Sequence, residues 1–310
     1  MANATTPTRL KVYLAFAAIY IIWGSTYFFI REALDGFPPF MLGALRFLVA
    51  GGLMLAWCAA RGVSIRPKGD LRNVALIGFL LLFVGNGVVV WTEQTIPSSM
   101  VAIMIASAPL WFVLLDRPNW RANFRSASTM LGVLAGFIGV VLLFSEKIAD
   151  QFAATGLSPE MTALGLLIIC EIGWTSGSLF AKAHPPSIPA PVNTAWQMLA
   201  GGTCFLLVSV PRGEWSLDWS GIPAHACFAL IYLALIGSIL AYSSYVWLLR
   251  VRPAIQVSTY AYVNPVVAVL MGVYLGNERI GWRELAGLAV ILGGVLLINL
   301  AKYREKRREA

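Results

Sequence analysis

The sequence predicts an all-α membrane protein, in which ten transmembrane helices form two inverted five-helix repeats around a central cavity. Hydrophobic residues make up 58% of the 310 positions and charged residues only 12%, against roughly 25% charged in an average soluble domain. The apolar runs are continuous and near the ~20 residues that a helix needs to cross a bilayer, whereas the strands of a membrane β-barrel alternate in polarity over about ten residues. The third observation is an internal duplication.

The duplication is clearest in two segments bounded by prolines, Pro97 to Pro109 and Pro253 to Pro265, which start 156 positions apart (97 against 253). A tryptophan stands six positions before each segment, Trp91 and Trp247. Each copy holds an odd number of apolar spans, so the two copies must cross the bilayer in opposite orientations. Inverted repeats of this kind are typical of transporters that work by alternating access.

Ten segments have the length and hydropathy of a membrane span: residues 12–30, 40–60, 71–91, 97–115, 127–144, 161–181, 192–210, 224–249, 254–275 and 283–301. The first follows Arg9 and Lys11 and could be mistaken for a signal peptide, but its apolar run is longer and lacks a small-x-small cleavage site. We expect it to be retained. The predicted units are a first repeat over 1–145, an inter-repeat linker over 146–160, a second repeat over 161–301 and a basic tail over 302–310.

The distribution of charge predicts the orientation. The net charge of +8 is spread over alternate short loops and the carboxyl end, not gathered on one soluble face, which argues against nucleic acid as a partner. If the amino terminus is cytoplasmic, most Lys and Arg fall in cytoplasmic loops. The positive-inside rule therefore predicts that both termini are cytoplasmic.

Several function classes lack their signatures. The two histidines, His184 and His225, are far apart without a His-Glu-x-x-His pattern, and no span holds paired carboxylates, which argues against an enzyme. No Gly-Lys-Ser/Thr phosphate loop exists for an ATP-driven pump, and no ring of charge or repeated carbonyl filter indicates a channel. The four cysteines have no metal-ligand spacing. We expect a non-enzymatic transporter without metal or cofactor, and a membrane-embedded enzyme is the distant alternative.

Four motifs carry a family resemblance: Trp23–Tyr27 (WGSTY), Ala44–Phe47 (ALRF), Val84–Gly87 (VGNG) and Thr259–Val266 (TYAYVNPV). With these the chain resembles the EamA family of ten-helix exporters in the drug/metabolite transporter superfamily, and within it the YedA-type exporters of bacterial inner membranes. The resemblance implies that the first four helices of each repeat surround the cavity and that the fifth packs outside. It also implies export of small organic solutes, such as amino acids, their derivatives, or amphipathic and cationic metabolites and drugs, across the inner membrane.

A gradient-driven facilitator or an importer of one metabolite is the alternative within transport. The repeats are not identical: the turn after the fourth span is Asp116–Trp120, where the second repeat has Gly276–Arg279. The two ends of the gate are therefore not expected to be equivalent. Glycines in the fifth and tenth spans favour close helix packing, either inside the molecule or in a weak homodimer; a monomer and a weak dimer both remain open.

Two charged residues lie well inside predicted spans, Arg46 and Glu171. A charge at the bilayer centre costs on the order of 3 kcal/mol even on permissive insertion scales, so each is a functional hypothesis. Glu171 shares a helix face with Trp174 and Ser178 and is the proton-coupling candidate, exchanging a proton for a cationic substrate. The alternatives for it are a structural hydrogen bond in the protonated form, or substrate recognition without a proton. Arg46 is interpreted as a structural or gate contact, or as an anion site.

The candidate substrate-binding residues share a helical stripe or an equivalent position in the other repeat: Tyr20, Trp23, Tyr27, Asn86, Met100, Met104, Glu171, Trp174, Ser178, Tyr242, Gln256, Tyr260 and Asn264. The polar stripe of the ninth span corresponds to methionines in the fourth, so we expect one polar and one soft apolar wall, suited to amphipathic organic molecules. An ordinary apolar core is the alternative for an aromatic stripe. Pro109 and Pro265, inside their spans, are predicted hinges, because each removes a helix hydrogen bond.

Overall fold

The computed structural model describes residues 8–67, 69–145 and 157–309, and these ranges contain helices and no strand. The first repeat comprises α1 (Arg9–Ala17), η1 (Ala18–Ile22), α2 (Trp23–Leu34), α3 (Pro39–Ala60), α4 (Leu71–Gly78), η2 (Phe79–Val84), α5 (Gly85–Thr92), α6 (Ser98–Ile105), α7 (Ala108–Leu115), η3 (Arg117–Asn119), α8 (Trp120–Arg125) and α9 (Ala127–Leu143). The second comprises α11 (Pro159–Ala183), α12 (Ala190–Ser209), η4 (Trp219–Gly221), α13 (Ala224–Tyr232), η5 (Leu233–Tyr242), α14 (Ser243–Val251), α15 (Ala254–Val257), α16 (Tyr260–Tyr274) and α17 (Trp282–Glu309).

Each of the ten predicted segments is helical, and within the described residues six helical stretches are long and apolar enough to cross a membrane by length and composition, if the short break in Ser98–Leu115 is disregarded. Much of the predicted linker, residues 146–156, lies outside the described residues. The helix of the last span does not end where the basic tail was predicted to begin, since α17 continues to Glu309. Local signals start several helices: Ser126 and Ser158 accept a hydrogen bond from the N–H three residues later, and Pro39 occupies the first turn of α3.

Three spans contain a π-helical segment that the sequence did not predict, namely η1, η2 and η5. Each is continuous with an α-helix on both sides, so these spans do not bend into loops. A π turn holds an extra residue and therefore rotates the side chains that follow it relative to those before it. Side chains of α2 and α5, which follow η1 and η2, therefore face differently from what a regular helix would predict.

The fourth and ninth spans are broken. Ala106 and Ser107 separate α6 from α7, and Ser258 and Thr259 separate α15 from α16. Pro109 lies in the first turn of α7, where a missing N–H costs no helical hydrogen bond. Pro265 lies inside α16. Their role as hinges stays a prediction.

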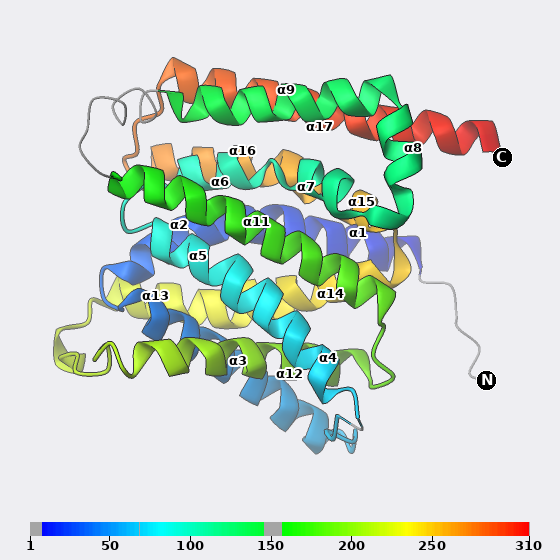
Figure 1. The fold of residues 1–310 in the computed structure, drawn as a ribbon. Coiled ribbons are helices and arrows are strands. Elements are labelled where there is room, and N and C mark those ends of the chain that lie inside the picture. Colours follow the sequence, from blue (N-terminus) through cyan, green and yellow to red (C-terminus); the bar gives the residue numbers. More distant parts are fainter. Residues whose placement is uncertain (1–7, 68, 146–156, 310) are drawn as a thin grey trace.

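The fifth helices of the two repeats pack on each other. Helices α9 and α17 lie side by side along one edge of the bundle, and α3 and α12 lie along the opposite edge (Figure 1). A Cβ added at Gly132 would lie 2.5 Å from the carbonyl oxygen of Gly294, and one at Gly139 would lie 3.0 Å from that of Gly287. The glycines therefore allow the two backbones to touch inside the molecule.

At one end of the bundle α2 and α16 end and α6 begins; we call it the Glu278 end. Here carboxylates of the second repeat accept hydrogen bonds from the first turns of helices in the first repeat. Glu278 accepts hydrogen bonds from the N–H and hydroxyl groups of both Ser98 and Ser99. Glu214 accepts from the N–H of Met41, in the first turn of α3, at 2.7 Å.

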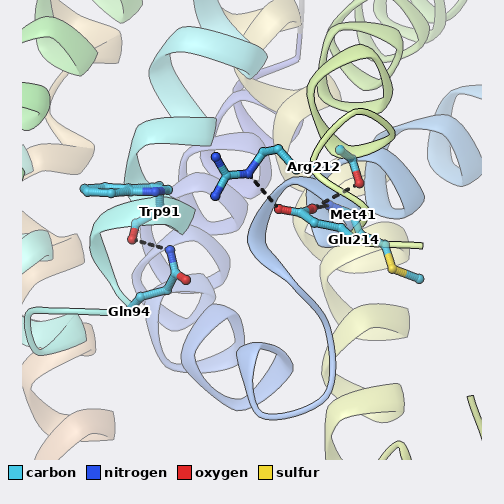
Figure 2. Close-up of polar contacts among 6 residues, drawn as sticks. Met41, Trp91, Gln94, Arg212 and Glu214 are labelled. Carbon is cyan, nitrogen blue, oxygen red and sulfur yellow. Dashed lines mark hydrogen bonds and ion pairs between the residues drawn. The ribbon is translucent and has the colours of Figure 1, made fainter. Parts of the chain in front are cut away.

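Figure 2 shows Glu214 between Met41 and Arg212. Nε of Arg212 lies 3.5 Å from Oε1 of Glu214. In the same view the amide of Gln94 donates to the carbonyl oxygen of Trp91 at 2.9 Å. The opposite end, where α11 and α14 end, is called the Lys182 end. There the ammonium of Lys182 donates to the carbonyl oxygen of Arg252 at 2.9 Å.

Candidate functional site

A small cavity lies between helices of both repeats, with a volume of about 60 Å³, room for about two water molecules. Eight predicted residues line it: Trp23, Tyr27, Arg46, Asn86, Glu171, Trp174, Tyr260 and Asn264. Six further lining residues were not predicted: Thr26, Ile30, Gly85, Val89, Ile105 and Cys170. The cavity therefore combines an acid, a base, two amides and four aromatic side chains in a space that α2, α3, α5, α6, α11 and α16 surround.

The two predicted intramembrane charges meet in this cavity. Arg46 is only 3% exposed and does not reach the membrane interface; its Nε donates to Ser238 Oγ at 2.9 Å and its Nη1 donates to Asn86 Oδ1 at 3.1 Å. Both partners are side chains, one from each repeat. Glu171 is 1% exposed, and its Oε2 has no hydrogen-bond partner in the described part of the chain. An unsatisfied buried carboxyl oxygen is costly, so it is a place where a ligand or a water molecule is expected.

Four aromatic side chains pack together beside the cavity, and three of them, Trp23, Trp174 and Tyr260, line it. The ring centroid of Trp23 lies 5.4 Å from that of Trp174, 4.9 Å from Tyr245 and 5.2 Å from Tyr260. Such edge-on and tilted arrangements are favourable beyond area burial alone. Tyr245 was not predicted, although its spacing of three residues from Tyr242 was a signal that could have found it. Its hydroxyl is 2.6 Å from Ser178 Oγ, which puts the predicted Ser178 behind these rings.

Three other predicted residues do not reach the cavity. Tyr20 lies within η1, and its hydroxyl is hydrogen-bonded to Thr259 Oγ1 at 2.6 Å. Tyr242 donates to Gln197 Oε1 at 2.7 Å, so it does not occupy the place that its equivalence to Asn86 predicted. Gln256 is exposed, because the break after α15 separates it from the stripe on α16.

The predicted methionine wall is also displaced. Met100 and Met104 are buried in an apolar core cluster with 7% and 1% exposure, and neither lines the cavity. Ile105, the last residue of α6, lines it in their place. The cavity thus has an apolar side on the fourth span, as expected, but a different side chain provides it.

A second pocket, of about 380 Å³, opens near the Lys182 end. Its polar lining consists of Lys182, Arg250, Asn193 and Gln197, and no carboxylate lines it. Gln197 also accepts the hydrogen bond from Tyr242. A polar vestibule therefore lies at this end of the bundle, whereas the Glu278 end is held together by carboxylates.

Sequence reasoning missed Glu93, which falls in a predicted loop but is completely buried. Neither carboxylate oxygen has a hydrogen-bond partner among the described residues. Burial raises the pKa of Glu93 well above its ordinary value, and the charge of Glu278 raises it further, against the opposing effect of Arg31 and Arg46. Partial burial also raises the pKa of Glu278, but the hydrogen bonds from Ser98 and Ser99 outweigh it and hold that pKa below the ordinary value.

Comparisons with known proteins agree with this architecture. The EamA-like transporter family matches residues 10–145 and 161–300. The inner membrane transporter YedA of Escherichia coli K12 is 39% identical over 300 residues, which cover 95% of this chain and 92% of YedA. Protein PecM of Dickeya dadantii is 25% identical over 297 residues, covering 93% of this chain and 92% of PecM. A solved crystal structure with 21% identity shares the fold with a TM-score of 0.67, covering 94% of this chain and 98% of that chain.

Proposed function

Since this chain belongs to the EamA-like transporter family, we propose that it exports small organic solutes across the bacterial inner membrane by alternating access. Membership confirms the resemblance in the sequence and the fold class of ten helices in two inverted repeats. The chain is a membrane transporter, and the absence of enzymatic activity is part of the proposal. Substrate, direction and coupling are the other parts that we propose.

One observation carries the proposal: a cavity lined by both repeats is also lined by the two charged residues predicted inside spans, Arg46 and Glu171. A volume of about 60 Å³ holds water but no organic solute, since small-molecule sites are typically ~300 Å³ or larger. The described conformation thus has no room for a solute, which requires the repeats to separate at one end. A carboxylate, a guanidinium and aromatic walls suit amino acids, their derivatives or amphipathic cations.

The orientation follows from the positive-inside rule. We assign the Lys182 end, with its polar vestibule, to the cytoplasm together with both termini, and the Glu278 end to the periplasm. A solute then enters from the vestibule near Gln197 and leaves past Glu278. Glu171 is the proposed coupling site: a carboxyl group in an apolar enclosure binds a proton when the cavity is empty and releases it when a cationic group takes its place.

The experiment begins with a thermal-shift screen of the purified protein against amino acids, organic cations and common antimicrobials, followed by flux of each hit in proteoliposomes. A hit is expected to raise the melting temperature and to cross the bilayer chemically unchanged. A chemically altered product would indicate an enzyme and overturn the proposal.

A second experiment tests proton coupling by comparing two variants with the wild type. Glu171→Gln is expected to abolish proton movement that depends on the hit, while binding persists. The matched control is Glu160→Gln, on the first turn of the same helix and outside the cavity; its coupling is expected to equal that of the wild type. Normal coupling in Glu171→Gln would exclude Glu171 as the proton site.

A further inference from the structure

Glu93 is an unexplained polar group between the cavity and the Glu278 end. Its N–H donates to the carbonyl oxygen of Val89 at 3.1 Å, so the last turn of α5 continues through it. The side chain is completely buried, and both carboxylate oxygens lack partners among the described residues. An ionised carboxylate in such a place is very unfavourable, whereas the protonated form is tolerated. Packing alone does not explain an acid here, but proton binding does.

Two neighbouring helices, α5 and α2, each place Glu93 about one helical turn beyond the cavity. Val89, four residues earlier, lines the cavity, and residues four apart share a helix face. On the neighbouring α2, Tyr27 lines the cavity, and Arg31, four residues later, donates from Nη1 to the carbonyl oxygen of Glu93 at 3.1 Å. The step from Val89 to Glu93 and the step from Tyr27 to Arg31 lead to the same place. Glu93 therefore follows Tyr27 on the way from the cavity to the Glu278 end.

The groups around Glu93 form a series from surface to cavity. The charged side chains that act on it are Glu278, Arg31 and Arg46. Tyr27 is within electrostatic range of both Glu93 and Glu171. Because Glu278 is only partly buried, the order from solution inwards is Glu278, Glu93, Tyr27, Glu171.

We infer that Glu93 and Tyr27 carry protons between the Glu278 end of the bundle and Glu171. Glu93, protonated in its buried site, gives its proton to the Tyr27 oxygen while the hydroxyl proton of Tyr27 passes to the Glu171 carboxylate. A proton from solution then binds the Glu93 carboxylate that is left. Tyr27 and Glu93 end as they began, and one proton has moved inwards. The inference rests on the proposed coupling at Glu171 and adds the residues by which the proton reaches it.

The test measures proton arrival at Glu171 directly, without a transported solute. Full-length protein in lipid nanodiscs is given a rapid drop in pH, and infrared spectroscopy follows the carboxyl C=O band that Glu171→Gln removes. Glu93→Gln and Tyr27→Phe are each expected to slow the appearance of this band by on the order of 100-fold, the contribution of one positioned proton-transfer group. The matched control is Glu214→Gln, a helix-capping carboxylate at the same end (Figure 2), in which the rate is expected to be unchanged.

The outcomes separate this inference from the proposed function. If Glu93→Gln and Tyr27→Phe both bind the proton at the wild-type rate, the path is wrong and coupling at Glu171 still stands. If the wild type has no band that Glu171→Gln removes, coupling at Glu171 fails, and the path fails with it. Should Glu93→Gln not fold, Tyr27→Phe keeps the ring and decides the matter, with Glu93→Asp expected to retain the fast rate.

Discussion

Oε1 of Glu278, in the second repeat, accepts hydrogen bonds from both the N–H (2.9 Å) and the hydroxyl (2.7 Å) of Ser98, the first residue of α6 in the first repeat. The first N–H groups of a helix have no partner within the helix, and a carboxylate there is favoured by hydrogen bonding and by the helix dipole. In the corresponding turn of the first repeat, Asp116 accepts a hydrogen bond from Asn119 instead. The difference between the two turns that the sequence showed is therefore a difference in how the two ends are held.

Removing the charge of Glu278 should loosen this contact. Glu278→Gln loses charge-assisted hydrogen bonds, and we expect it to lower the free energy of unfolding by about 1–2 kcal/mol. Thermal denaturation in detergent measures this change. The adjacent exposed Arg279 offers a control, since Arg279→Gln should melt as the wild type does; equal melting temperatures for both variants would show that the contact contributes nothing.

The stability of the protein should depend on pH through Glu93, whose pKa burial raises well above its ordinary value of 4.5. The folded state then holds this proton to a higher pH than the unfolded chain does. Its stabilising contribution is complete below pH 4.5 and is lost as pH rises through the folded-state pKa. Glu93→Gln is neutral throughout, so its stability relative to the wild type should rise with pH and then level off. A difference that is constant with pH would contradict this assignment.

Two neighbouring glycines of α17 should respond oppositely to alanine. A Cβ at Gly294 would lie 2.5 Å from the carbonyl oxygen of Gly132, whereas a Cβ at Gly293 meets nothing within 4 Å. We expect Gly294→Ala to destabilise the protein by about 1–3 kcal/mol. Gly293→Ala should be neutral or stabilising by up to about 1 kcal/mol, because alanine favours the helix. Unfolding curves of the two variants check this, and equal destabilisation would show that α9 and α17 do not pack closely.

The substitution Arg46→Lys should slow transport. The guanidinium of Arg46 joins Ser238 in the second repeat to Asn86 in the first, and the single ammonium of lysine cannot reproduce that fork. Loss of one such charged hydrogen bond should reduce the flux of a hit by on the order of tenfold. Arg61→Lys, at the exposed end of the same helix, is the control and should transport normally. Normal flux in Arg46→Lys would remove Arg46 from the transport cycle.

The helices and the duplication could be predicted because span length and apolar composition are properties of consecutive residues. Which side of a helix faces the cavity could be predicted only where the helix is regular. Trp23 and Tyr27 follow η1 and line the cavity, while Tyr20, inside η1, does not. The break after α15 likewise separates Gln256 from Asn264. A sequence pattern with a period of 3.6 residues assumes a regular α-helix, so it does not reveal the extra residue of a π-helical turn.

Two important residues left little or no trace in the sequence. Glu93 stands in what the hydropathy pattern predicts to be a loop, and only tertiary packing buries it. Tyr245 lies in the same span as Tyr242, which the sequence analysis chose instead, and it packs behind the cavity through ring contacts with Trp23 and Trp174. Both are properties of how helices from different repeats meet, which no single stripe of residues encodes.

The contact between α9 and α17 is reciprocal: Gly132 approaches the carbonyl oxygen of Gly294 and Gly294 that of Gly132, while Gly139 and Gly287 approach each other in the same way. This is the pattern that two identical subunits make across a two-fold axis, where each contact appears twice with the partners exchanged. The seam therefore retains the form of a homodimer interface within one polypeptide. An isolated first repeat would expose this face on α9, and only a second copy in the opposite membrane orientation could cover it in the same way.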